Sequence, residues 1–319
     1  MLVCKTPYRV SLVGGGSDIE SYYRYSEGKV ISFAIDKYIV ISVSQLATQQ
    51  IILDNDRKEI INDIGQIKHD IVREVLTKFN LGLGYKIEVR SDFPIGSGMG
   101  GSSAFTVGLV NVISKTVGIE LSSREIAEIA YEIEAVILGS PIGKQDHYAA
   151  AFGGINMLTF RTNGDVEVES LAAMKNSVDR IVDSLSLAPV GGQRKAATIL
   201  SEQSKGMEDE EKRRLITKIV ELVPETYLAI KTIDLGSLGA SLHESWKLKK
   251  QLASNISSIE LNNAIAKASH TAGFKGGKLL GAGGGGYFLK VNDKLEPGSQ
   301  EVGSSDIRFK ICWQGSKIV

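Results

Sequence analysis

The stretch Pro94-Ile95-Gly96-Ser97-Gly98-Met99-Gly100-Gly101-Ser102-Ser103-Ala104 lies between an alternating segment and an amphipathic one. Residues 85–90 alternate apolar and charged side chains, which predicts a half-buried strand. Residues 105–117 carry apolar side chains at helical spacing. A glycine-rich loop therefore leads into a helix N-terminus. Glycines let the backbone approach a ligand closely, and the free N–H groups of a first helical turn favour an anion such as phosphate.

Other phosphate loops fit this stretch less well. A Walker A loop ends in Gly-Lys-Ser or Gly-Lys-Thr, and the stretch holds no lysine. The dinucleotide fingerprint is formally matched by Gly96, Gly98 and Gly101, but Pro94 separates the strand from the first glycine. Glu120, at the distance of a ribose-binding acid, is followed by a helix start and is not preceded by a second buried strand. We favour a third class of phosphate loop, with a serine-capped flexible turn as the simpler alternative.

The bulk composition excludes several classes of function. A chain of 319 residues is long enough for two domains, and 43% apolar and 23% charged residues are typical of soluble globular proteins. The formal net charge is zero, so we expect neither nucleic acid nor a membrane as a partner. Cys4 and Cys312 lack metal-type spacing, which favours a reduced, cytoplasmic setting. No stretch has the pattern of a signal peptide or a membrane span.

Strands and helices follow one another without regular alternation. In the first half we expect strands at 2–13, within 29–46, and at 49–53, 85–90 and 155–160, and helices at 66–79, 105–117 and from Ser122 to before Pro141. In the second half we expect strands within 178–189 and at 287–291 and 307–313, and helices at 205–223, 237–253 and 259–272. This order predicts an α+β protein. We place a domain boundary at residue 160, which gives an N-terminal domain 1–160 and a C-terminal domain 161–319.

The opening strand contains one candidate residue and leads to another. It ends in three glycines, residues 14–16, followed by Ser17 and Asp18. Asp18 is either an N-cap or a carboxylate that a backbone without side chains brings to a ligand hydroxyl. Arg9 lies inside the strand, and the strand alone favours a surface arginine at the edge of a sheet.

Two acidic residues beyond the phosphate loop are further candidates. Ser122 and Glu125 have the pattern of a capping box, which starts a helix. At about 100° per residue, Glu134 falls on the apolar arc of that helix. A buried carboxylate must be paired or bind metal, so Glu134 either forms a salt bridge with a buried arginine or is a Mg²⁺ ligand beside the phosphate loop. Asp146, between two glycine clusters, suits a general base, with an N-cap as the alternative.

A third glycine-rich stretch, residues 276–286, precedes a strand near the C-terminus. By itself it could be a hinge. Three glycine motifs in this order, at residues 7–18, 94–104 and 278–286, together resemble the GHMP small-molecule kinases. Gly-Gly-Gly-Ser-Asp after the first strand resembles the sugar kinases of the family. Gly-Lys-Gln-Asp followed by Tyr-Ala-Ala-Ala-Phe-Gly-Gly is most similar to the members that act on D-glycero-D-manno-heptose 7-phosphate.

The resemblance implies a two-domain α+β GHMP kinase fold, with a ribosomal-protein-like N-terminal domain, a ferredoxin-like C-terminal domain and the site between them. It implies a cytoplasmic, ATP-dependent transferase that uses Mg²⁺ and phosphorylates the anomeric hydroxyl of the heptose 7-phosphate to the 1,7-bisphosphate, for the synthesis of GDP-heptose and surface polysaccharide. We expect a monomer or a homodimer. Open alternatives are a kinase for a free sugar such as galactose or fucose, a non-catalytic sugar- or nucleotide-binding protein, and a nicotinamide-dependent oxidoreductase.

The resemblance also implies a role for each candidate residue. Asp146 would accept the proton of the attacking sugar hydroxyl or orient it, with Arg9 keeping the carboxylate ionised. Mg²⁺ would bind Ser103 and Glu134. The ATP phosphates would be held by Gly96, Ser97, Gly98, Gly100, Gly101, Ser102 and Ser103. The sugar phosphate would be held by Gly15, Gly16, Ser17, Asp18, Arg194, Gly283, Gly284 and Gly285. Arg194 is our candidate for the 7-phosphate because it follows a Gly-Gly turn.

Overall fold

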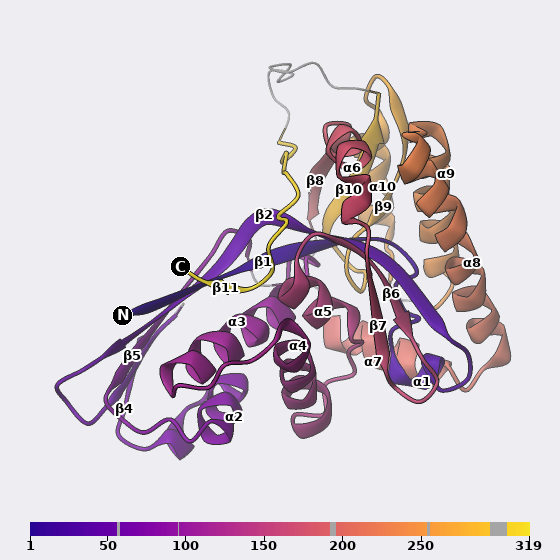
Figure 1. Cartoon of the computed structure of the whole chain (residues 1–319). Coiled ribbons are helices and arrows are strands. Elements are labelled where there is room, and N and C mark those ends of the chain that lie inside the picture. The colour runs from indigo at the N-terminus through magenta and orange to yellow at the C-terminus, as the bar shows by residue number, and fades with distance from the viewer. Residues whose placement is uncertain (56–57, 95, 192–195, 254–255, 294–304) are drawn as a thin grey trace.

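The chain folds around two sheets (Figure 1), and the computed structural model describes residues 1–55, 58–94, 96–191, 196–253, 256–293 and 305–319. The larger sheet has eight strands in the order β11-β1-β2-β5-β3-β4, with β6 pairing with β2 and β7 pairing with β6. Its strands are β1 (Leu2–Val13), β2 (Gly28–Gln45), β3 (Ile51–Asp54), β4 (Lys58–Ile61), β5 (Tyr85–Ser91), β6 (Ile155–Phe160), β7 (Val166–Ser170) and β11 (Lys317–Ile318).

Helices cover one face of the larger sheet (Figure 1). They are η1 (Ile64–Gln66), α2 (Asp70–Lys78), α3 (Gly101–Thr116), α4 (Ser123–Tyr131), its π-helical continuation η2 (Glu132–Ile137) and α5 (Gln145–Phe152). The central helix, α3, packs on β1 and β2, and nearly all of its residues from Ser103 to Ser114 are buried. A helix that is apolar on all sides must be buried among other elements. Its glycine-rich N-terminus is therefore held at a fixed place over the sheet.

The smaller sheet has three antiparallel strands in the order β8-β10-β9 and carries the remaining long helices. The elements of this part are η3 (Ala172–Met174), α6 (Lys175–Val182), β8 (Leu185–Gly191), α7 (Ala196–Gly206), α8 (Glu210–Thr232), α9 (Leu235–Lys249), α10 (Ile259–Ser269), β9 (Phe274–Leu279) and β10 (Gly286–Asn292). Helices α8 and α9 also contact β1, which joins the two parts. Trp246 lies in the apolar core of this second part.

The first strand reaches both the glycine loop and the second part. The β1–β2 register shifts between Pro7 and Tyr8 and again between Ser11 and Val13. Such irregularities bend a strand and redirect its side chains. Arg9 lies between the two shifts, and its backbone N–H donates to the carbonyl of Met99 in the glycine loop at 3.2 Å. After β1, the first glycine run and the short helix α1 (Glu20–Tyr23) lead back into β2.

The α+β prediction is confirmed, and two predicted strand segments differ from the structure. The strand region 178–189 is a strand only in its second half, in β8, because residues 175–182 form helix α6, in which Val178, Ile181 and Val182 bury one helical face. Residues 307–313 form only isolated bridges, Ile35 with Ile311 and Leu187 with Ile307. The sequence analysis also missed the short strands β4 and β9, and helix α3 begins at Gly101 instead of residue 105.

The division of the chain at residue 160 stays a prediction. Strand β7 lies beyond that residue and pairs with β6, and β11 at the end of the chain pairs with β1. The N–H of Cys312 likewise donates to the carbonyl of Ala34 at 2.9 Å. Both ends of the second part therefore return to the larger sheet. Among the described residues, no helix has the length and hydropathy that a membrane crossing requires.

Candidate active site

The second and third glycine segments are in backbone contact. A Cβ atom added to Gly281 would lie 2.5 Å from the Cα of Gly98, and one added to Gly98 would lie 2.8 Å from the carbonyl oxygen of Leu280. The backbone of Gly286 meets the carbonyl of Ser97 in the same way. No other residue fits at these positions without moving the backbone. The glycines are thus explained in part by packing between two loops far apart in the chain.

The glycine loop turns into α3 through left-handed backbone. Gly96, Gly98 and Gly100 have φ angles of 80°, 76° and 75°, a region that favours glycine. Gly100 is the N-cap of α3, and no side chain caps the helix. The N–H groups of the first turn, which includes Ser102 and Ser103, are therefore available to an anion. This geometry suits the predicted phosphate site, whose role stays a prediction.

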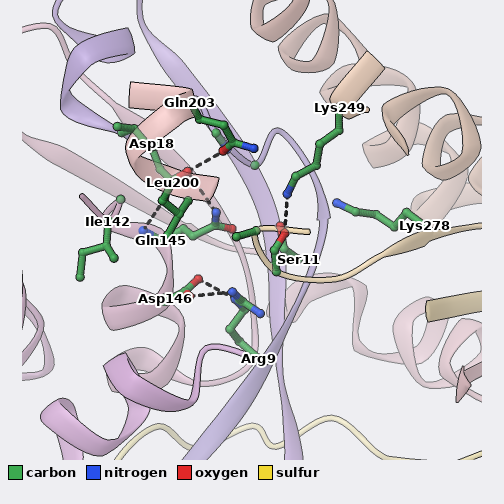
Figure 2. Close-up of a pocket in the computed structure, with 16 residues that line it drawn as sticks. Arg9, Ser11, Asp18, Ile142, Gln145, Asp146, Leu200, Gln203, Lys249 and Lys278 are labelled. Atoms are coloured by element: carbon green, nitrogen blue, oxygen red, sulfur yellow. Dashed lines mark hydrogen bonds and ion pairs between the residues drawn. The ribbon is translucent and has the colours of Figure 1, made fainter. Parts of the chain in front are cut away.

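Arg9 and Asp146 form a bidentate ion pair (Figure 2). Nε of Arg9 donates to Oδ1 of Asp146 and Nη2 to Oδ2, each at 2.6 Å, while Nη1 donates to the carbonyl of Gly98 at 2.8 Å. Arg9 is only 5% exposed, so the surface arginine that the strand alone favoured is wrong. Fork-shaped pairs of this kind fix geometry as well as charge. Asp146 is held in the first turn of α5, against the glycine loop.

Asp18 ties the first glycine segment to the loop that carries Asp146. Its Oδ1 accepts from the Gly16 N–H and from Nε2 of Gln145, each at 3.0 Å, and its Oδ2 accepts from the Gln145 N–H at 3.2 Å. Burial raises the pKa of the Asp18 carboxyl, and the charge of Asp146 raises it further. Gly143 packs so closely on the carboxylate that a side chain there would collide with it. Asp18 does not cap α1, whose N-cap is Ile19.

Glu134 is buried and paired with His147. Nε2 of His147 lies 2.8 Å from Oε2 of Glu134, and the Ser102 hydroxyl donates to Oε1. Burial alone would raise the pKa of Glu134, but the hydrogen bonds from His147 and Ser102 outweigh it and hold the pKa below its usual range. The partner is therefore a histidine, and the alternative of a buried arginine is wrong. The sequence alone leaves the role of His147 open, and no local pattern signals its pairing with Glu134.

The two serines at the start of α3 face different surroundings. The Ser102 side chain is exposed and contacts Glu134, whereas Ser103 is buried in the first turn. A carboxylate next to a hydroxyl is a donor set that suits Mg²⁺, which keeps other positions for phosphate oxygens and water. The described residues contain no cluster of three or more His, Cys, Asp or Glu side chains that could hold a metal. Glu134 and the neighbouring serine hydroxyls therefore fit an ion that takes few protein ligands and completes its coordination with phosphate oxygens and water.

A cavity opens between the two parts of the chain, above the Arg9–Asp146 pair (Figure 2). Its walls come from β1, the first glycine segment, the loop before α5, helices α7 and α9 and the third glycine segment. Gly15, Gly16 and Asp18, for which we predict substrate contacts, line this cavity. Ser17 does not, because its hydroxyl turns inward and donates to the Gly14 carbonyl at 2.7 Å.

Three of the remaining predicted substrate residues, Gly283 to Gly285, lie away from the cavity. The backbone at Gly283 and Gly284 packs against Ile256, whose carbonyl accepts from the Gly284 N–H at 2.8 Å. Residues 283–285 are not part of the cavity wall. Arg194, our candidate for the 7-phosphate, lies outside the described residues. The predicted roles of these positions stay predictions.

Two lysines that the sequence analysis did not assign point into the cavity (Figure 2). Lys249 ends α9 and donates to the carbonyl of Gly281, and Lys278 in β9 donates to the carbonyl of Leu12 at 2.9 Å. Burial, and after it the charge of Arg9, lowers the pKa of Lys249 to about 8. Burial also holds the pKa of Lys278 well below its usual value. Lys278 is the first residue of the third glycine motif, so its place in the sequence is notable. Lys249 has no such signal, because a lysine at the end of an amphipathic helix is common.

The fold and the site together define the chain as a small-molecule kinase. A glycine loop lies at a helix N-terminus, and an aspartate held by an arginine lies beside a cavity between the two parts of the chain. Comparison with known proteins agrees. The family model for the GHMP kinases N terminal domain matches residues 67–154. The D-glycero-alpha-D-manno-heptose 7-phosphate kinase of Campylobacter jejuni is 31% identical over 300 residues, 89% of this chain and 87% of its own length. The chain belongs to the GHMP kinase family, which confirms our prediction of family, fold and kinase class.

Two further relatives cover the whole fold. The mevalonate kinase of Methanocaldococcus jannaschii is 26% identical over 98% of this chain and 99% of its own. The solved structure of a D-glycero-D-manno-heptose 1-phosphate kinase from Bacteroides thetaiotaomicron superimposes with a TM-score of 0.78 at 24% identity, covering 100% of this chain and 99% of that one. At that identity the superposition demonstrates the fold alone.

Proposed function

We propose that the chain transfers the γ-phosphoryl group of ATP to the anomeric hydroxyl of D-glycero-D-manno-heptose 7-phosphate, giving the 1,7-bisphosphate for GDP-heptose and surface polysaccharide synthesis. The observation that carries the proposal is the Arg9–Asp146 pair, two bonds of 2.6 Å at the floor of a cavity that Asp18 also lines. The named activity of the 31% identical relative supports the choice of sugar.

In the proposed reaction Asp146 faces the acceptor hydroxyl. The hydroxyl proton passes to a carboxylate oxygen of Asp146 as the sugar oxygen bonds to the γ-phosphorus and the bond to the β-phosphate oxygen breaks, releasing ADP. Arg9 balances the charge of Asp146 and fixes its orientation. Phosphoryl transfer depends mainly on positioning and charge stabilisation, so one oriented carboxylate and a cradle of backbone amides are sufficient in kind.

The start of α3 would hold the nucleotide phosphates, through the N–H groups that follow Gly100. Mg²⁺ would bind Glu134 together with a serine hydroxyl of the same turn, Ser103 as the motif implies or Ser102, which contacts Glu134. The ion would neutralise charge on the triphosphate. Because Nε2 of His147 donates to the Glu134 carboxylate, His147 would keep that carboxylate in place beside the phosphates.

Asp18 would accept hydrogen bonds from sugar hydroxyls, with the backbone of residues 14–16 around it. Gln145 holds the Asp18 carboxylate and so would set its direction. Gly283, Gly284 and Gly285 would approach the substrate and phosphates from the second part of the chain. With only ATP and a sugar phosphate as partners, the enzyme would work in the cytoplasm as a monomer or homodimer.

A panel of acceptors in an ADP-release assay tests the proposal. Heptose 7-phosphate should be turned over in the presence of ATP and Mg²⁺, and ³¹P NMR of the product should show one phosphate on the anomeric oxygen. Turnover of galactose or fucose without turnover of the heptose phosphate would instead define a free-sugar kinase. Sugar binding with no ADP release from any acceptor would define a binding protein, and tight binding of NADH in place of ATP would point to an oxidoreductase.

A further inference from the structure

The two cavity lysines have no anionic partner within the described residues. Neither ammonium group takes part in an ion pair there, and each donates to a single backbone carbonyl, that of Gly281 for Lys249 and that of Leu12 for Lys278. An ammonium has three N–H donors. Two donors on each lysine are therefore left for something in the cavity. Lys278 is only 4% exposed, so water does not solvate it freely.

Neither carboxylate of the cavity wall forms an ion pair with these lysines. The other charged residues of the cavity wall are Arg9, Asp18 and Asp146. Asp146 forms its ion pair with Arg9, and Asp18 accepts hydrogen bonds from Gly16 and Gln145 and none from a lysine among the described residues. Confining two cations near one another without a counter-charge is unfavourable, which agrees with the lowered pKa of both lysines. An anion in the cavity would remove that cost.

Unpartnered polar atoms on the cavity wall point independently to a ligand. Among the residues that the structure describes, the hydroxyl of Ser11 and Nε2 of Gln203 find no hydrogen-bond partner, and both residues are at least nine-tenths buried. Oε1 of Gln145 is also buried and unpartnered. All three residues line the same cavity as the lysines. Buried polar groups normally have hydrogen-bond partners, so we expect these atoms to form hydrogen bonds with a polar ligand in the cavity.

We propose that Lys249 and Lys278 form the subsite for the phosphate that the acceptor sugar already carries. This inference rests on the proposed function, and it assigns a binding site to the 7-phosphate of the proposed substrate. The lysines share the cavity with Gly15, Gly16 and Asp18, the predicted sugar contacts, whereas residues 96–103 of the phosphate loop do not line it. A neutral hexose would leave both ammonium groups unpaired. The site therefore selects a phosphorylated sugar over a free one.

Steady-state kinetics of Lys249→Met and Lys278→Met test the subsite. Loss of a charge-assisted hydrogen bond should raise KM for heptose 7-phosphate about 10- to 100-fold. KM for ATP should change less than about twofold, because residues 96–103 of the phosphate loop do not line this cavity. Lys247→Met is the matched control: Lys247 is 54% exposed on the same helix and pairs with Glu244, outside the cavity.

Binding measured without ATP gives a second readout. Titration calorimetry should show heptose 7-phosphate binding to the wild type and to Lys247→Met, and much weaker binding to Lys249→Met and Lys249→Gln. The Lys249 variants keep the proposal testable if Lys278→Met does not fold, which a thermal melt would reveal.

The outcomes separate this inference from the proposed function. Unchanged KM for heptose 7-phosphate in folded Lys249 variants would overturn the subsite and leave the function standing. A rise in KM for ATP alone would overturn it too, by assigning the lysines to the nucleotide. If the wild type uses a different sugar phosphate, with the same lysine dependence, the subsite stands and the choice of heptose fails. Turnover of free sugars only would overturn both.

Discussion

Arg9 and Asp146 are separated by 137 positions in the sequence, and two hydrogen bonds of 2.6 Å join them in the structure. The pair links β1 to the first turn of α5, and Arg9 reaches the glycine loop as well through the Gly98 carbonyl. One buried side chain thus sets the distance between the proposed base and the proposed phosphate site. The position of Asp146 depends on packing in the larger sheet more than on its own loop.

Replacement of the proposed base should remove turnover while the fold survives. Asp146→Asn keeps the size of the side chain but cannot take a proton, so kcat should fall about 10²- to 10⁴-fold, with KM for ATP nearly unchanged. Steady-state kinetics measure the effect. Asp165→Asn, in the turn between β6 and β7, is the control and should retain full activity. Wild-type turnover in Asp146→Asn would contradict the assignment of Asp146.

Removal of the buried carboxylate of Glu134 should weaken the use of Mg²⁺. In Glu134→Gln the charge is lost while the side-chain shape is kept, and the Mg²⁺ concentration for half-maximal activity should rise about tenfold or more. A Mg²⁺ titration at saturating ATP measures the shift. Glu132→Gln is the matched control, because Glu132 lies two residues away and pairs with Lys78. An unchanged Mg²⁺ requirement with a lower melting temperature would make Glu134 a purely structural residue.

The affinity for the sugar phosphate should fall above pH 8. The pKa of Lys249 is lowered to about 8, so the free enzyme loses this charge as pH rises through that value, and with it one contact to phosphate. The groups that face Lys249 across the cavity are Arg9, Asp18, Asp146 and Lys278. We expect kcat/KM for the sugar phosphate to decline between about pH 7.5 and 9 in the wild type.

The same pH profile in Lys249→Met should lack this decline. The control reaction is turnover of the unphosphorylated heptose, which should be independent of Lys249 over the same range. An identical decline in wild type and variant would assign the ionisation to another group.

The contact between the second and third glycine segments should not tolerate a methyl group. In Gly281→Ala the new Cβ would lie 2.5 Å from the Cα of Gly98, and the φ angle of 73° is strained for alanine. We expect a loss of more than about 1 kcal/mol in the free energy of unfolding and a higher KM for ATP. Chemical denaturation and kinetics measure both. Gly82→Ala is the control, since a Cβ there meets nothing within 4 Å, and a similar loss in both variants would refute the packing argument.

Parts of the site could be predicted because their residues carry local signals. Gly96, Gly98 and Gly100 have left-handed backbone, so the need for glycine at these positions makes the loop visible in the sequence. The order of the three glycine motifs along the chain resembles one family. Asp146 stands out because it lies between glycine clusters. Glu134 stands out because a carboxylate on an apolar helical arc needs a partner.

Other parts depend on contacts that no local pattern encodes. His147 pairs with Glu134 across two helices, and the turn of α3 decides which of two adjacent serines meets that carboxylate. Lys249 becomes a cavity residue only because the end of α9 lies over the third glycine segment. Helix α6 was misread because a short apolar stretch fits a strand or a helix equally well, and tertiary packing chose between them.

The chain passes between its two sheets twice, once after β7 and once where Ile307 bridges to Leu187 and Ile311 to Ile35. A body attached at two points cannot swing freely about a single linker. The smaller sheet is therefore anchored to the larger one on both sides of its own sequence. The spacing of the two cavity walls is then set by the covalent chain as well as by the packing between them.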